Sequence, residues 1–179
     1  MNSTAPLSVA QPWALANGVT ATLRPIRPQD AAMEQQFVRD LSDEARYFRF
    51  MMGVRELTPE MLERFTRIDP AREMAFIITV MRNSLETEIA VGRYVINADD
   101  ESAEFAIVVA DDWQHQGVGS RLMQALIGHA RARGLKRMDG FVLAANAKML
   151  ELMRELGFET HTSADDATTR IVTMQLQVN

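Results

Sequence analysis

The fold is decided by the stretch Gln114-His115-Gln116-Gly117-Val118-Gly119. An apolar run, residues 105–110, precedes it, and an amphipathic run, residues 118–130, follows it. This order predicts a strand, a glycine loop and a helix. Such a loop presents several backbone N–H groups at the positive end of a helix, where a phosphate group binds readily. The glycines allow the backbone to approach that ligand without a Cβ in between.

Two familiar phosphate-binding loops do not fit this stretch. A P-loop ends in Gly-Lys-Ser/Thr, whereas the last glycine is followed here by Ser120 and Arg121. A dinucleotide-binding loop needs a third glycine, and Leu122 occupies that position. The stretch fits the pattern Gln/Arg-x-x-Gly-x-Gly/Ala instead. The pattern is short, and a glycine-rich turn before an ordinary helix explains it equally well when it is taken alone.

The composition narrows the class of protein. A chain of 179 residues with 47% hydrophobic content is long enough for one globular domain with a sizeable core. The absence of cysteine excludes disulfides, thiolate nucleophiles and cysteine-ligated metals. The three histidines have no metal-binding spacing, so no metal is expected. A net charge of −5 argues against nucleic acid as the main partner.

The N-terminal residues predict a leader rather than a targeting segment. Residues 1–16 lack the basic start and continuous apolar core of a signal peptide. Pro6 and Pro12 disfavour helix, so residues 1–17 are expected to form a flexible or strap-like leader before a single domain over 18–179. The apolar runs are too short to span a membrane, and a cytoplasmic protein without a membrane partner is therefore expected.

The hydrophobic periodicity predicts strands and helices along the rest of the chain. Strands are expected over 19–23, 74–80, 89–96, 103–109, 138–143 and 171–176, with a further one near Phe158. Helices are expected over 30–41, from Thr58, over 118–130 and over 147–156, with a hairpin turn over 82–88. Thr58 and Asn146 are candidate N-caps, and Gly134 and Gly157 are candidate C-terminal glycines. A meander of strands followed by strands alternating with helices indicates a mixed α/β sheet.

Several segments together resemble the GCN5-related N-acetyltransferase (GNAT) superfamily. They are the strand 103–109, the loop with Gln114, Gly117 and Gly119, the helix that begins at Asn146, and its ending Glu155-Leu156-Gly157-Phe158. A weaker pattern, residues 24–30, extends the match to nearly the whole chain. The resemblance implies a mixed, mostly antiparallel sheet flanked by helices, with two splayed central strands between which the pantetheine arm of coenzyme A enters.

A narrower resemblance concerns the acceptor. Residues 23–28, 41–50 and 72–75 are similar to the acetyltransferase domain of bacterial protein lysine acetyltransferases of the Pat type. Members of that group modify lysines of acyl-CoA synthetases. The resemblance therefore implies an acetyl-CoA-dependent N-acetyltransferase with an amine acceptor, in particular a protein lysine such as one on an acyl-CoA synthetase. It also implies that a homodimer can form.

Glu104 is the candidate catalytic base. An amine must lose its proton before it attacks a thioester, and a positioned base contributes about 10²–10⁴-fold to that step. By alternation Glu104 shares a strand face with Ala106 and Val108. Burial in such an apolar run would raise the pKa of a carboxyl group, which would suit a base. From the pattern alone, solvent exposure or pairing with an arginine is the alternative. Pat-type domains have their catalytic glutamate in this strand.

The resemblance also implies which residues hold the coenzyme. The backbone of Ile107, Val108 and Val109 would pair with the pantetheine arm, and an N–H of Val108 or Val109 would stabilise the tetrahedral oxyanion. Asn146 would form a hydrogen bond to the arm near the thioester. The pyrophosphate would be held by the loop and the first turn of the helix, that is by Gln114, His115, Gln116, Gly117, Val118, Gly119 and Ser120.

One departure from the superfamily leaves alternatives open. Many members have a tyrosine that reprotonates the leaving thiolate, and Met153 occupies that position here. Either solvent serves instead, because a thiol with a pKa of about 8.5 is a tolerable leaving group, or another residue does. Two other functions stay open beside lysine acetylation. The first is the same chemistry on a small amine or amino acid, and the second is a non-catalytic acyl-CoA-binding sensor module.

Overall fold

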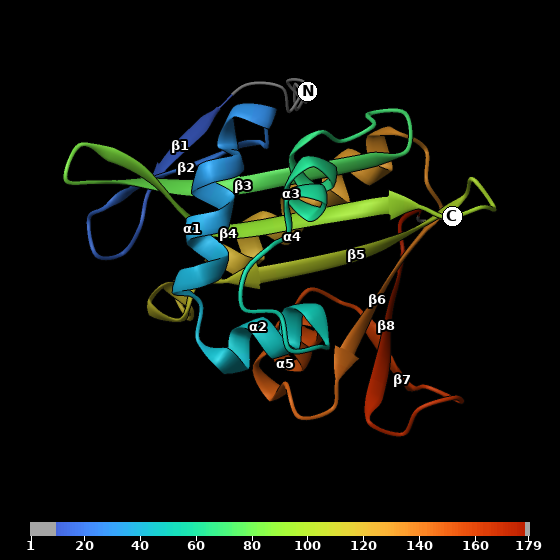
Figure 1. Ribbon diagram of the computed structural model, residues 1–179. Helices are drawn as coiled ribbons and strands as arrows, with labels where there is room; N and C mark the ends of the chain where they lie inside the picture. Colours follow the sequence, from blue (N-terminus) through green and yellow to red (C-terminus); the bar gives the residue numbers. More distant parts are fainter. Residues whose placement is uncertain (1–9, 178–179) are drawn as a thin grey trace.

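The computed structural model describes residues 10–177 and shows a mixed α/β fold (Figure 1). An eight-stranded sheet has the order β1-β2-β3-β4-β5-β6-β8-β7. The strands are β1 Gln11–Ala14, β2 Thr20–Pro25, β3 Glu73–Arg82, β4 Leu85–Ile96, β5 Ser102–Val109, β6 Arg137–Leu143, β7 Glu159–Thr162 and β8 Thr169–Gln175. The helices are α1 Ala31–Asp40, α2 Asp43–Phe50, α3 Pro59–Thr66, α4 Val118–Ala132 and α5 Ala147–Glu155, with 3₁₀ turns over Pro28–Asp30 and Asp111–Trp113.

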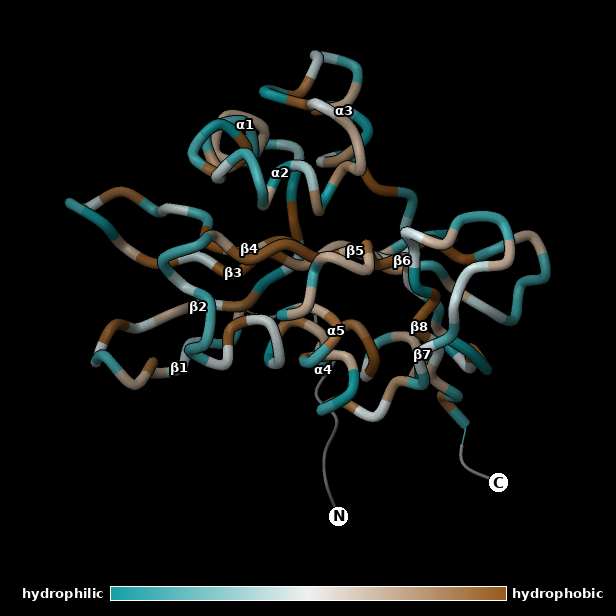
Figure 2. The backbone as a smooth tube through the Cα atoms, turned by 90° about the horizontal axis from the view of Figure 1, so that it is seen from below, coloured by the Kyte–Doolittle hydropathy of each residue, from teal (hydrophilic) through white to brown (hydrophobic). Residues whose placement is uncertain are grey.

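The helices cover both faces of the sheet. Figure 2 shows α1, α2 and α3 on one face and α4 and α5 on the other. Side chains of consecutive residues in the central strands point alternately toward the two helical layers, as strand geometry requires. Phe76 packs in the core on the α4 side, whereas Ile77 packs with Phe37 and Val38 of α1. No helix in the described chain combines the length and apolarity needed to cross a membrane.

The central strands part in the middle of the sheet. Within residues 10–177, every strand pair is antiparallel except β5 with β6, which run parallel. That pairing extends only from Ser102 and Arg137 to Phe105 and Gly140, after which the two strands diverge (Figure 1). The mixed, mostly antiparallel sheet with splayed central strands that the sequence implies is thus confirmed.

A glycine lies at the point where the strands separate. The ring of Phe105 packs directly on Gly140, and a Cβ there would lie 2.5 Å from Cε1 of that ring. The same ring packs against Phe158 with ring centroids 5.3 Å apart. An aromatic side chain therefore lies over the last paired position and ties β5 to the chain that leaves α5.

Two expectations about the N-terminal half need correction. The hairpin turn expected over 82–88 is only Asn83–Ser84, which have φ values of 46° and 65°. A two-residue turn with positive φ at both positions matches the twist of the flanking strands, so both strands extend further than hydropathy indicates. Residues 11–14 of the expected leader form β1 and pair with β2. Residues 1–9 lie outside the described residues, and the exact start of the domain stays a prediction.

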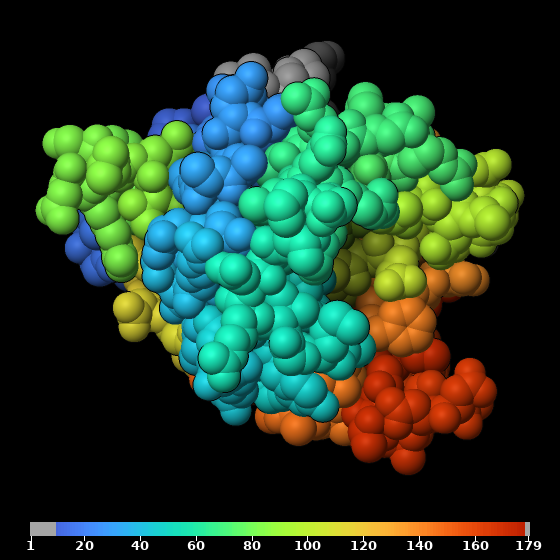
Figure 3. All heavy atoms as spheres, viewed as in Figure 1, coloured from blue at the N-terminus to red at the C-terminus, as the bar shows by residue number. Residues whose placement is uncertain are grey.

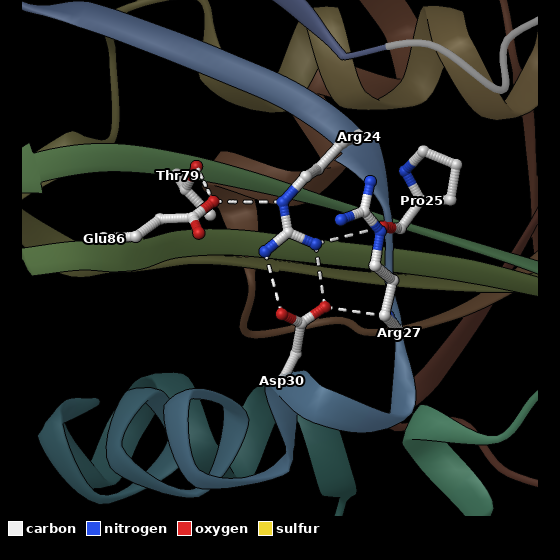
Figure 4. A network of polar contacts seen from close by, with 6 residues as sticks. All are labelled: Arg24, Pro25, Arg27, Asp30, Thr79 and Glu86. Atoms are coloured by element: carbon white, nitrogen blue, oxygen red, sulfur yellow. Dashed lines mark hydrogen bonds and ion pairs between the residues drawn. The ribbon is translucent and has the colours of Figure 1, made fainter.

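A buried ion pair fastens α1 to the sheet (Figure 4). Arg24, at the end of β2, donates two hydrogen bonds of 2.8 Å to the carboxylate of Asp30. The backbone N–H of Arg27 donates to the same carboxylate at 2.7 Å. Glu86 accepts from Arg24 at 3.0 Å and from the hydroxyl of Thr79 at 2.9 Å. Residues 24–30 therefore join β2 to α1 through the contacts of Asp30 with Arg24 and Arg27, which we call the clamp.

Candidate coenzyme and acceptor site

A cavity of about 370 Å³ lies where β5 and β6 part. The C-terminal half of β5, the loop after it, α5, α2 and the end of β6 supply its walls. Figure 3 shows the surface of α2, in cyan, beside the orange surface of α5 and β6 on one face of the molecule. In the described residues 10–177, no group of His, Asp and Glu has a metal-binding arrangement.

The loop presents a series of free donors at one end of this cavity. Among the described residues, no acceptor is found for the backbone N–H groups of residues 115–120. His115 and Gly117 have φ values of 58° and 77°, which turn successive N–H groups toward the same side. Gly117 is the N-cap of α4, so these donors lie at the positive end of that helix. The arrangement suits a pyrophosphate.

Gln114 holds the loop in place. Its Nε2 donates to the carbonyl of Val109 at 3.2 Å, and its Oε1 accepts from Nζ of Lys148 at 3.2 Å. The side chain therefore joins the end of β5 to α5 and is occupied within the protein. Gln116 and Val118 do not line the cavity with their side chains, so the backbone N–H is the group that each offers to a ligand.

The direction of the backbone N–H groups along β5 decides which of them can act as the oxyanion donor. The N–H of Ala110 donates to Ile89 of β4 at 2.9 Å. Since backbone groups alternate in direction along a strand, the N–H groups of Ile107 and Val109 point into the gap and that of Val108 points toward β4. Of the two donors that the sequence suggests, Val109 is therefore the one that faces the cavity.

Asn146 lies at the N-terminus of α5 and lines the cavity. Its Oδ1 accepts from the N–H of Met149 at 3.2 Å, which is an ordinary N-cap contact. Its side-chain NH₂ group has no partner in the part of the chain that the structure describes. The same residue can therefore cap the helix and donate to a ligand.

Glu104 lies on β5 opposite Asp139, where β5 is still paired with β6, and it does not line the cavity itself. It is exposed, so the burial expected from the apolar run is not found. The side chain projects on the same face as Ala106, which lines the cavity, and it precedes that residue by about 7 Å along the strand. A base at this place is open to water, and a proton can reach it directly or through one water molecule.

Met153 does not replace the missing tyrosine. It is fully buried in the core on the α4 side of the sheet and does not line the cavity. Tyr94 is also buried, and its hydroxyl forms a hydrogen bond of 2.7 Å with Nδ1 of His129. Tyr47 is exposed on α2 and does not line the cavity either. Neither tyrosine of the chain therefore lies at the cavity, and solvent there can supply the proton.

The cavity also contains residues that the sequence patterns do not single out. Glu44, Phe48 and Arg49 project from α2 into it, and Phe141 of β6 lies opposite. Their only signal in the sequence is their place in or near segments that carry the family resemblance.

We expect replacement of Gly117 by Ala to weaken coenzyme binding. An alanine at this positive φ is strained by about 1–2 kcal/mol, which would turn the loop N–H groups out of line. The dissociation constant for acetyl-CoA, measured by calorimetry, should rise about tenfold. Gly128→Ala is the control, because Gly128 lies within α4 and its added Cβ meets nothing within 4 Å. Equal affinity of both variants would contradict the role of the loop.

The comparison with known protein families identifies the fold family. The model described as "Acetyltransferase (GNAT) family" matches residues 36–158. The chain is 34% identical over 154 residues to Acetyltransferase PA5475 of Pseudomonas aeruginosa, covering 86% of this chain and 83% of that protein. It is 35% identical over 136 residues to Acetyltransferase Pat of Mycolicibacterium smegmatis, covering 75% of this chain and 40% of that protein.

The similarity extends to a solved structure. The crystal structure of the GNAT domain of S. lividans PAT superimposes with a TM-score of 0.82 at 28% identity, covering 93% of this chain and 96% of that chain. A matched family model, a relative aligned over most of its length and this superposition agree with the free loop and the splayed strands described above. The chain belongs to the GNAT family and is an acetyl-CoA-dependent N-acetyltransferase.

Proposed function

We propose that this N-acetyltransferase acetylates lysine side chains of a protein, and that Glu104 is the general base for direct attack of the amine on acetyl-CoA. The observation that carries the proposal is the position of the Pat-like segment 41–50. This segment forms α2 and a wall of the cavity, and it includes none of the loop that would hold the phosphates. The similarity to Acetyltransferase Pat and to the S. lividans domain supports the same assignment.

The proposed reaction uses the geometry of β5. The N–H groups of residues 115–120 bind the pyrophosphate, and the free edge at Ile107 and Val109 aligns the pantetheine arm in the gap. Glu104 accepts the proton that the lysine ammonium must lose, since a free lysine with a pKa of about 10.4 is mostly charged near pH 7. The N–H of Val109 then donates to the oxyanion. Water in the open cavity returns a proton to the leaving thiolate.

The rim near α2 is suited to a large acceptor. Tyr47 and Met52 expose 51% and 60% of their surface, and Met51 is exposed beside them. Exposed aromatic and methionine side chains are enriched where proteins meet each other. A folded protein that presents a lysine would contact this rim, whereas a small amine held in the cavity would not reach it.

A panel of acceptors tests this proposal. The purified chain is given acetyl-CoA with acyl-CoA synthetases in one series and with small amines and amino acids in the other, and thiol release is followed. We expect release with a synthetase, and mass spectrometry should find the acetyl group on a lysine. Turnover with small amines alone would reject the protein acceptor. Tight binding of acetyl-CoA without thiol release on any acceptor would favour a non-catalytic sensor.

The cytoplasmic location and the homodimer stay predictions.

A further inference from the structure

Arg49 occupies an unusual position in the cavity wall. It lines the cavity from α2, as do Glu44, Ala45 and Phe48 of the same helix. α2 covers the face of the sheet opposite α4, whose N-terminus carries the free loop N–H groups (Figure 2). The guanidinium of Arg49 is therefore separate from the phosphate-binding end of the site and lies on the side where the acceptor would enter.

No hydrogen-bond or ion-pair partner is found for the Arg49 guanidinium within residues 10–177. Its one recorded aromatic contact is with Phe50, with Cζ 5.0 Å from the ring centroid. Arg49 is partly buried. The other arginines of the described chain either have an oxygen partner or are exposed to solvent, where water satisfies them. A partly buried arginine usually has an oxygen atom as its hydrogen-bond partner.

Arg49 keeps its charge in the cavity wall. Burial and the neighbouring Arg93 lower the pKa of Arg49 to about 10, so the group keeps its charge at neutral pH. Glu34 of α1 acts in the opposite direction, but it lies outside ion-pair distance. Burial and the charge of Glu34 raise the pKa of Glu88 well above its usual value, which favours its neutral form.

In residues 10–177, the groups of α1 and β4 near Arg49 give its guanidinium no direct partner. Arg93 uses Nη2 for the carbonyl of Phe65, at 3.0 Å, and its Nε has no partner. Oε2 of Glu34 is buried without a partner as well. An anion in the cavity would give the Arg49 guanidinium the hydrogen-bond partner that it lacks among the described residues.

We propose that Arg49 is a specificity-determining residue, which binds a carboxylate of the acceptor, namely an aspartate or glutamate side chain beside the target lysine. The proposal rests on the proposed lysine acceptor. The planar guanidinium fork matches a carboxylate with two parallel hydrogen bonds. Such a pair would hold the acceptor chain against α2 while the lysine reaches the thioester near Val109.

Matched peptides test this inference. Two lysine peptides differ only in a glutamate or a glutamine next to the lysine, and kcat/KM is measured for each. We expect the wild-type enzyme to prefer the glutamate peptide by at least about tenfold, since hydrogen bonds between charged groups are stronger than those to a neutral amide. In Arg49→Met the preference should fall to about one. Arg49→Lys keeps the charge without the fork and should show an intermediate ratio.

The controls separate specificity from folding and from the choice of acceptor. Arg55→Met alters an exposed arginine shortly after α2 and should keep the wild-type ratio. If no lysine peptide is acetylated, the lysine acceptor is rejected, and the same ratio is taken between amino acids and amines that lack the carboxylate. A preference for the carboxylate that Arg49→Met abolishes would then still support the role of Arg49. A wild-type ratio near one in both series, or a ratio that neither Arg49 variant changes, would overturn it.

Discussion

Glu104→Gln is expected to lower kcat by about 10²–10⁴-fold, while the affinity for acetyl-CoA stays near that of the wild type. Glutamine is close in size but cannot accept a proton from the lysine ammonium. In the proposed site the coenzyme contacts come from the loop and from the backbone of β5, and Glu104 does not line that cavity. Thiol release gives the rate, and calorimetry with acetyl-CoA gives the dissociation constant.

The pH dependence adds a second readout for the base. Without Glu104, the residual reaction depends on lysine that is already neutral. Its rate should therefore keep rising with pH toward the free lysine pKa of about 10.4. Glu44→Gln is the matched control, because Glu44 is the carboxylate of α2 that lines the cavity. Loss of turnover in Glu44→Gln but not in Glu104→Gln would move the role of base to α2.

Asp30→Asn is expected to destabilise the fold by about 3–5 kcal/mol at neutral pH, the usual effect of removing one partner of a buried ion pair. The side chains of Arg24 and Asp30 are exposed by only 7% and 9%, so water cannot replace the lost carboxylate. Chemical denaturation of the two proteins gives the difference in the free energy of unfolding. Glu86→Gln is the control. Glu86 contacts the same guanidinium but is 43% exposed, so its loss should remove at most about 1 kcal/mol.

The difference in the free energy of unfolding between wild type and Asp30→Asn should become smaller at acid pH. Burial alone would raise the pKa of Asp30, but the hydrogen bonds from Arg24 and from the backbone of Arg27 lower it below the usual 3.8. A carboxyl whose pKa is lowered by folding stabilises the native state fully above its unfolded pKa. That stabilisation is lost as the pH falls through the lower folded value. Equal stability of the two proteins at neutral pH would contradict the clamp.

Local signals made much of the fold predictable from the sequence. Thr58 caps α3 by accepting from the N–H of Met61 at 3.2 Å, and Asn146 caps α5, both as expected. Gly134 and Gly157 have positive φ after α4 and α5. These features depend on residues that are close in the chain, and few residue types satisfy them.

Other features depend on partners that are distant in the chain. β1 exists because residues 11–14 have a free edge of β2 to pair with, which hydropathy does not show. Glu104 is exposed because its face of β5 is uncovered at that point, although the residues around it in the sequence are apolar. The unpartnered state of Arg49 depends on α1 and β4, so no sequence pattern reveals it.

The central claim is that the gap between β5 and β6, closed at one end by the loop of residues 114–119, is the acetyl-CoA site. A crystal structure of this chain with acetyl-CoA tests it most directly. We expect the pyrophosphate on the N–H groups of residues 115–120, the pantetheine arm along Ile107 and Val109, and the thioester on the side of the gap that Glu104 and α2 face. A coenzyme bound outside this gap, or a pyrophosphate without contact to the loop, would contradict the account.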